Sequence, residues 1–149
     1  MRKYLTDKLG RKYTLKVIED SKDLYWIELY QKGDFAGHAK FPYFQSNIWK
    51  DGDIYIRDDS DPAENIMGSL MKPIKAISYR RCGLGTALLK FIFKCAGERQ
   101  ITSIYGYAVK KDVAKTPWLL KWYFKHGFES CAPYSAATKD VVAWICKKL

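Results

Sequence analysis

A basic turn with two glycines has the residue types that bind phosphate. Arg80 and Arg81 stand just before Gly83 and Gly85. Apolar residues then recur at the three- and four-residue spacing of a helix with one buried face, at Leu84, Ala87, Leu88, Phe91, Ile92, Cys95 and Ala96. The first amides of a helix have no acceptor inside it and carry partial positive charge, and glycines let a ligand approach them closely. The pattern predicts a phosphate or pyrophosphate site at the start of a helix over residues 84–98.

Other phosphate-binding motifs fit this turn less well. The chain has no Gly-x4-Gly-Lys-Ser/Thr string, as a nucleoside triphosphate loop requires. A dinucleotide fingerprint would need a third glycine where Leu88 stands. A bare Gly-x-Gly is also typical of a helix start where the glycines allow tight packing and the arginines only add solubility. The prediction of a phosphate site therefore depends on the longer string around the two glycines.

That longer string resembles a family motif. Ser78 to Gly85 is similar to the Arg-x-x-Gly-x-Gly motif that binds the acyl-CoA pyrophosphate in the GNAT superfamily of N-acetyltransferases. Tyr123 to Phe128 resembles a second GNAT signature, Tyr-x-x-x-Gly-Phe, in which a helix is followed by a strand. The two motifs and the helix, strand and helix between them cover residues 78–131.

The resemblance implies an α/β (α+β) acyl-CoA N-acyltransferase fold over one domain, residues 1–149. Its mixed, twisted sheet of about six to seven strands would be splayed at its centre and flanked by helices. Alternation and turn residues predict strands over 12–19, 24–30, 35–44, 53–58, 101–109, 128–131 and 140–147. They also predict a helix over 118–125, a basic loop over 110–115 and a marginally structured loop over 59–78.

The resemblance also implies an activity, the transfer of an acetyl group from acetyl-CoA to a primary amine by direct attack. The pyrophosphate would rest on the turn formed by Arg80, Arg81, Cys82, Gly83, Leu84, Gly85 and Thr86. The pantetheine would pair with the strand before the motif. Tyr123 stands where many members place the tyrosine that protonates the CoA thiolate.

The base that removes the amine proton is less clear from the sequence. Some members use a carboxylate on the fourth strand, which makes Asp58 the candidate here, with Asp59 beside it. His38 titrates in the range of a base at neutral pH, but a lone histidine in a strand favours a structural role.

Three features depart from the family pattern. Residues 59–78 replace the usual tight link between the fourth strand and the glycine turn, and they are a candidate lid. Thr116 stands where many members have an asparagine, and we expect its hydroxyl to cap the following helix and contact the cofactor. The usual pair of helices between the first two strands is missing, since only residues 20–23 lie between them.

The composition of the chain bears on two other interpretations of its function. The net charge of +10 and the pI of about 9.4 favour anionic partners such as coenzyme A. The basic residues are scattered, which argues against a nucleic-acid-binding domain as the third interpretation. The second interpretation is a GNAT-fold module that binds acyl-CoA as a sensor or scaffold without chemistry.

Four widely spaced cysteines and two histidines predict neither a metal site nor a disulfide framework, and they fit reduced thiols in a cytoplasmic protein. No apolar run is long enough to span a membrane. The acceptor, a small-molecule or peptide amine, is left open by the sequence, and so is a homodimer.

Overall fold

The computed structural model describes residues 3–19, 25–41, 43–45, 47–50, 53–56, 79–133 and 140–149. In chain order, the elements are β1 (Lys3–Thr6), β2 (Lys12–Glu19), β3 (Tyr25–Gln31), β4 (Asp34–Phe41), β5 (Tyr43–Gln45), β6 (Ile48–Lys50), β7 (Asp53–Ile56), α1 (Leu84–Glu98), β8 (Ser103–Val109), α2 (Lys110–Lys115), α3 (Leu119–Lys125), β9 (Glu129–Ser130) and β10 (Val141–Lys148).

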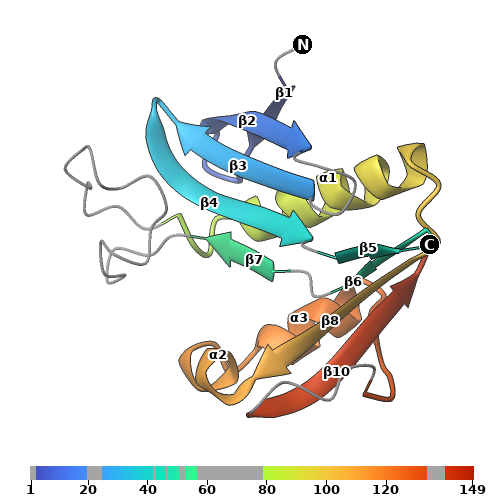
Figure 1. The fold of residues 1–149 in the computed structure, drawn as a ribbon. Coiled ribbons are helices and arrows are strands. Elements are labelled where there is room, and N and C mark those ends of the chain that lie inside the picture. The colour runs from blue at the N-terminus through green and yellow to red at the C-terminus, as the bar shows by residue number, and fades with distance from the viewer. Residues whose placement is uncertain are drawn as a thin grey trace.

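The described strands form two five-stranded sheets. The first has the order β1-β2-β3-β4-β7 and is antiparallel throughout, and the second has the order β5-β6-β8-β10-β9. Only β6 and β8 pair in parallel among the described strands. Figure 1 shows the first sheet curving over α1, with α2 and α3 beside the second sheet.

The chain passes from one sheet to the other between β6 and β7. β6 pairs with the start of β8, at Ser103 and Ile104, whereas β7 pairs with β4. Only two residues separate the two strands. β7 and β8 therefore run apart toward their C-terminal ends (Figure 1). In the described chain, β7 is paired only on its β4 side, and β8 beyond Ile104 only on its β10 side.

The core lies between α1 and the two sheets. The buried face of α1 consists of Leu84, Leu88, Leu89, Ile92, Cys95 and Ala96, as the spacing of apolar residues predicts. It packs with fully buried residues of the first sheet, Tyr13, Ile27 and Leu29, and with residues of the second, Trp49, Ile104 and Ile145. One helix thus packs against both sheets and holds their relative positions.

Several predicted elements are confirmed. The mixed α+β architecture with a sheet parted at its centre is present, and α1 has the predicted bounds. The strands predicted over 12–19, 24–30, 53–58, 101–109 and 140–147 correspond to β2, β3, β7, β8 and β10. The strand predicted over 128–131 is the two-residue β9. The predicted loop over 59–78 lies outside the described residues.

Other predictions were wrong in part. The described chain has ten strands, more than the six to seven expected, because β1 precedes the first predicted strand and β6 was not foreseen. The strand predicted over 35–44 ends at Phe41, and the chain then enters the other sheet as β5. Residues 110–115 are a short helix, α2, in place of the predicted loop. The prediction that the usual pair of helices is missing concerned residues 20–23, which lie outside the described residues; between β1 and β2 there are only residues 7–11.

No helix in the described parts of the chain is long and apolar enough to cross a membrane. The same residues hold no group of three or more His, Cys, Asp or Glu side chains placed to bind a metal ion.

Leu88→Ala tests the role of α1 as the element that joins the two sheets. The Leu88 side chain is fully buried, so the truncation should lower the free energy of unfolding by about 2–5 kcal/mol. Lys94→Ala, at an exposed position of the same helix, should change it little. Chemical denaturation of both variants measures the difference, and equal stabilities would contradict the assignment.

Candidate cofactor and active site

The candidate site rests on the turn between β1 and β2, where Asp7 is a buried carboxylate. Its Oδ1 accepts hydrogen bonds from the backbone N–H groups of Leu9 (2.8 Å) and Arg11 (3.0 Å). Its Oδ2 accepts from the Arg11 Nε (2.8 Å) and the Tyr13 hydroxyl (2.6 Å). Burial alone would raise the pKa of Asp7, but the hydrogen bonds from Tyr13 and Arg11 lower it to about 2. The carboxylate is therefore ionised and satisfied inside the protein.

The glycine turn is tied to this support. The Lys8 backbone N–H donates to the Cys82 carbonyl at 2.7 Å, and the Cys82 thiol donates to the Tyr79 carbonyl at 3.0 Å. The Tyr79 hydroxyl donates to Asp34 at the start of β4, at 2.5 Å. Both Tyr79 and Cys82 are buried. The turn is thus held by β1–β2 on one side and by β4 on another before any ligand binds.

The backbone of the turn leaves the first amides of α1 open. Arg81 and Gly83 both have positive φ, 60° and 81°. At Gly83 a Cβ would lie 2.9 Å from the Lys8 side chain, so this glycine is required by conformation and by space. No side chain caps the helix, and the first helical bond runs from the Ala87 N–H to the Gly83 carbonyl. The N–H groups of residues 84–86 have no acceptor among the described residues, as an anion site requires.

Arg80, Arg81 and Gly85 differ in what they contact. The Arg80 Nε donates to the Ile56 carbonyl at 2.7 Å, which ties the turn to the end of β7. Arg81 is exposed. At Gly85 a Cβ would make only ordinary contacts, 3.5 Å from the Trp122 ring. Neither the backbone nor the neighbouring side chains therefore require glycine at Gly85.

A polar cluster joins the start of α1 to the end of α3. The Thr86 hydroxyl accepts a hydrogen bond from the Trp122 indole N–H at 3.2 Å and lies 3.4 Å from the His126 Nε2. Burial, followed by the charges of Lys125, Lys90 and Lys147, lowers the pKa of His126. The cluster adds a hydroxyl, an imidazole and basic side chains to the surroundings of the open amides.

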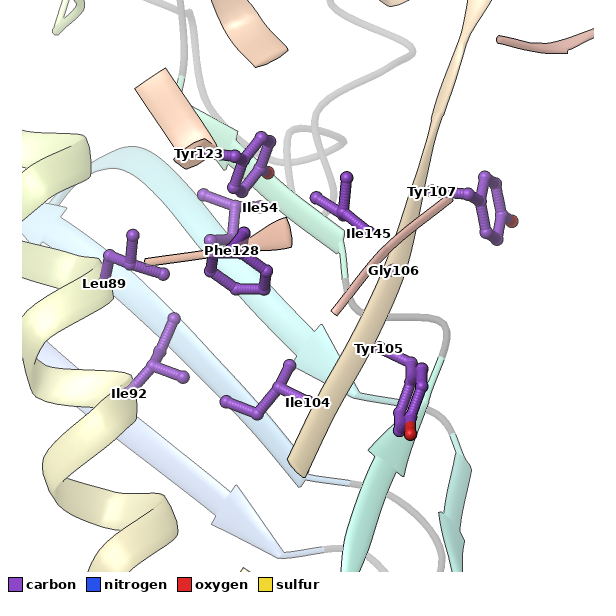
Figure 2. A pocket seen from close by; sticks show the side chains of 10 residues that line it. All are labelled: Ile54, Leu89, Ile92, Ile104, Tyr105, Gly106, Tyr107, Tyr123, Phe128 and Ile145. Carbon is purple, nitrogen blue, oxygen red and sulfur yellow. The ribbon is translucent and has the colours of Figure 1, made fainter. Parts of the chain in front are cut away.

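A pocket lies where the two sheets part. It has a volume of about 400 Å³, including space open to solvent, and it is lined by Ile54, Leu89, Ile92, Ile104, Tyr105, Gly106, Tyr107, Tyr123, Phe128 and Ile145. Figure 2 shows Leu89 and Ile92 of α1, Ile54 of β7 and Phe128 facing one another across it. Tyr105 and Tyr107 lie on the opposite side of β8 from Ile104. Most of the side chains that line the pocket are aliphatic or aromatic.

Tyr123 extends from α3 at one end of this pocket (Figure 2). Its ring makes edge contacts with Trp122 (4.9 Å) and Phe128 (5.3 Å). Burial, followed by the negative charges of Asp53 and Asp112, raises the pKa of the Tyr123 phenol above its ordinary value. No described residue accepts a hydrogen bond from its hydroxyl. The Tyr123 phenol is therefore protonated at neutral pH and can donate a hydrogen bond. The ring of Trp122 contacts the Tyr123 ring, and its indole N–H donates to Thr86 at the start of α1.

The remaining predicted site residues have different outcomes. Thr116 follows α2, where its backbone N–H donates to the Asp112 carbonyl at 2.8 Å and its carbonyl accepts from the Leu119 N–H at 3.0 Å. The prediction that its hydroxyl caps the next helix was wrong, because α3 begins at Leu119 after Trp118 without a side-chain cap. Its contact with the cofactor stays a prediction. Asp58 lies outside the described residues, as does Asp59.

Sequence reasoning missed the residues that support the site. Asp7 lies 75 positions from Cys82, and nothing in the spacing of either residue indicates the other. The local signal for its turn was the string Asp7 to Gly10, since Asp favours such turns and Gly10 has φ 80°. The sequence predicts Trp122 only as part of a helix, although in the structure it contacts a residue of each motif, Thr86 and Tyr123.

Comparison with solved structures shows the fold. The chain is similar to the GNAT domain of S. lividans PAT, with a TM-score of 0.68 and 10% identity over 99% of this chain and 97% of that one. It is similar to the ribosomal-protein-S18-alanine N-acetyltransferase of Escherichia coli, with a TM-score of 0.59 and 16% identity over 87% and 71% of the two chains. The PaiA N-acetyltransferase of Thermoplasma acidophilum, solved in complex with coenzyme A, gives a TM-score of 0.57 and 13% identity.

The chain therefore has the GNAT acyl-CoA N-acyltransferase fold, as the two motifs predicted. The match to the Thermoplasma protein covers 85% of this chain but only 62% of that one. No family model matches the sequence, and no curated protein matches it. These likenesses, all at low identity, establish the fold and leave the activity to be argued from the site.

Asp7→Asn tests the support beneath the glycine turn. The amide replaces an acceptor by a donor that faces the donors of Arg11 and Tyr13, so the variant should be less stable. Because the folded-state pKa of Asp7 is about 2, below its ordinary 3.8, the ionised carboxylate stabilises the fold above about pH 4. That contribution, about 2 kcal/mol, is lost as the pH falls through 2.

Urea unfolding of the wild type and Asp7→Asn between pH 7 and pH 2 measures this contribution. The difference in unfolding free energy should shrink as the pH falls. The exposed Glu98→Gln should remain close to the wild type throughout. A difference that does not depend on pH would contradict the role of the Asp7 charge.

Proposed function

We propose that this protein is an N-acetyltransferase that transfers the acetyl group of acetyl-CoA to a primary amine. One observation carries the proposal: Trp122 donates to Thr86 beside the open amides at the start of α1 and packs on Tyr123, whose phenol is at the pocket between two parted strands. The structural neighbours named above are N-acetyltransferases, and one of them was solved with coenzyme A, which supports the same reading.

The glycine turn suits the pyrophosphate of the cofactor. The open amides of residues 84–86 and the partial positive charge of α1 favour a bound anion. Arg81 is exposed beside them, and the charges of Lys90 and Lys125 act on the nearby His126. Preorganised donors cost little reorganisation on binding, because the Asp7 turn already holds the backbone in place.

The parting of the sheets suits the pantetheine and the thioester. β7 and β8 each have an edge that no described strand pairs with on the side of the parting, and Ile54 and Gly106 line the pocket there. An extended amide-bearing chain can pair with such an edge as an added strand. The apolar floor formed by Leu89 and Ile92 suits the methyl and methylene groups of the acyl-pantetheine arm.

The chemistry then needs no covalent enzyme intermediate. The amine nitrogen attacks the thioester carbonyl, a C–N bond forms, and the C–S bond breaks with its electron pair leaving on sulfur. In this proposal the Tyr123 phenol donates its proton to that sulfur, which is supported by its raised pKa and by the lack of an acceptor for its hydroxyl among the described residues. The acceptor class we propose is a small-molecule or peptide primary amine.

Gly85→Glu tests the cofactor seat. The new side chain would occupy the ligand space beside the open amides and bring charge of the wrong sign. Isothermal titration should show that acetyl-CoA and free CoA bind the wild type and fail to bind Gly85→Glu. Gly97→Glu is the matched control, because Gly97 is exposed at the other end of the same helix and a Cβ there meets nothing within 4 Å.

The two variants separate the site from general charge effects. If Gly97→Glu binds like the wild type and Gly85→Glu does not, the seat is at the start of α1. If a folded wild-type protein binds neither CoA compound, the transferase and the acyl-CoA-binding module both fail.

Tyr123→Phe tests the acid. It removes only the hydroxyl, so CoA affinity should be kept while turnover of an amine falls on the order of 100-fold. Thiol release from acetyl-CoA with a panel of primary amines measures the rate. Unchanged turnover would exclude Tyr123 as the proton donor, and binding without turnover in the wild type would favour the non-catalytic module.

A further inference from the structure

An aromatic cluster surrounds His38 on the face of the first sheet that is turned away from α1. The imidazole ring lies 5.6 Å from the ring of Trp26, 6.2 Å from Phe35 and 5.5 Å from Tyr55, measured between ring centroids. His38 is 9% exposed, while Trp26 and Tyr55 are half-buried, so the cluster reaches the surface. β3, β4 and β7 each contribute at least one of these side chains.

One nitrogen of His38 is held by a carboxylate. The Nε2 lies 3.3 Å from the Asp53 Oδ2, and Asp53 is the first residue of β7. Its side chain is 54% exposed. When the Nε2 carries the proton and donates to this carboxylate, the Nδ1 carries the lone pair. A carboxylate that orients an imidazole in this way also stabilises the imidazolium that forms when the other nitrogen takes a proton.

The other nitrogen has no hydrogen-bond partner among the described residues. The Nδ1 of His38 and the indole Nε1 of Trp26 are the buried side-chain polar atoms without a hydrogen bond that were found among the described residues. Both belong to this cluster. Buried polar atoms are almost always satisfied, so two unsatisfied atoms in neighbouring rings, one an acceptor and the other a donor, indicate a place for a polar ligand.

The cluster adjoins the pocket through β7. Successive side chains of a strand point to opposite faces, and Ile54 lines the pocket, so Asp53 and Tyr55 belong to the other face. The charge of Asp53 nevertheless acts on Tyr123. β7 thus carries the His38–Asp53 pair on one face and, through Ile54, a wall of the pocket on the other.

We propose that this cluster is the acceptor site and that the His38 Nδ1 removes the proton from the acceptor, a primary amine that carries an oxygen. The amine would donate to the Nδ1, and the oxygen would accept from the Trp26 indole N–H. This inference rests on the proposed acetyl transfer. It names a base other than Asp58, which the sequence had suggested.

The proton balance is complete. The ammonium form of the acceptor transfers a proton to the Nδ1 and becomes the free amine, which attacks the thioester. The sulfur leaves as thiolate and takes the Tyr123 proton. The nitrogen of the addition product still carries one proton more than the amide does, and it releases that proton to water as the C–S bond breaks. Water then returns both groups to their starting states, since the imidazolium releases one proton and the phenolate takes one up, so one proton is released overall.

Charged and titratable groups face His38 from each neighbouring strand. Glu28 of β3 and Tyr55 of β7 are its cross-strand partners. Lys40 of β4 stacks on Trp26, with its Nζ 5.5 Å from the ring centre. Asp53 completes the set. The two carboxylates favour a cationic acceptor, while Lys40 disfavours one with several positive charges.

The test compares His38→Gln, Asp53→Asn and their combination, each with acetyl-CoA and glycinamide, ethanolamine or n-butylamine. The readouts are the pH profile of kcat/KM and CoA affinity by titration. The wild type should lose rate toward acid pH, because a base that is already protonated cannot take the proton of the acceptor. His38→Gln should lower kcat/KM on the order of 100-fold and abolish this pH dependence, with CoA affinity kept.

Two further comparisons separate catalysis from structure. Asp53→Asn should lower the rate less than His38→Gln, and the double variant should equal His38→Gln alone, because the two residues act as one unit. Trp26→Phe should remove the preference for glycinamide over the equally large n-butylamine.

Each remaining outcome overturns the inference. If His38→Gln keeps the rate and the pH profile while the wild type is active, the base is elsewhere and the transferase activity stands. If the wild type binds acetyl-CoA but acetylates none of the three amines, this acceptor site is wrong while the cofactor seat stands. If acetyl-CoA does not bind, the proposed function and the inference built on it fail together.

Discussion

The site depends on the change of sheet between β6 and β7. Strand pairing holds β6 beside β8 and β7 beside β4, so two neighbouring stretches of the chain are drawn to different partners. The sheets must then part, and backbone polar groups along the parting need water or a ligand, because burying them unpaired is costly. Apolar side chains of α1, such as Leu89 and Ile92, fill the floor of the parting and keep it from closing.

A second constraint fixes the cofactor end of the same space. Desolvating the Asp7 carboxylate is unfavourable, yet four hydrogen bonds to its two oxygens outweigh that cost and hold its pKa well below the ordinary value. The Asp7 turn supports Cys82, and Arg80 ties the same loop to Ile56 at the end of β7. Two contacts therefore hold the glycine turn, the candidate anion site, in position relative to the gap between the sheets. One joins Lys8 to Cys82, and the other joins Arg80 to Ile56.

The features that could be predicted from the sequence are those that depend on residues close together in the chain. The glycine turn, the bounds of α1 and the Tyr123 motif depend on neighbouring residues and on helical spacing, and all were predicted. β1 and β6 were not, because strands of three or four residues carry too little alternation to stand out. The sequence of α2 predicts a loop, because this helix buries no residue and therefore has no apolar stripe. The Asp7 support and the His38–Asp53 pair join residues far apart in the chain, which only the folded register brings together.

The distribution of charge around the site follows the charges that the proposed reaction would bring to it. A net charge of +10 says little by itself, since the basic residues are scattered. In the folded chain, Lys90, Lys125 and Lys147 act on His126 beside the open amides, where a polyanionic cofactor would bind. Asp53 and Asp112 act instead on Tyr123. Burial raises the pKa of Tyr123 most, and these carboxylates add to it, because negative charge near a phenol opposes its ionisation. Basic side chains thus act on His126 and acidic ones on Tyr123, a separation that composition alone could not show.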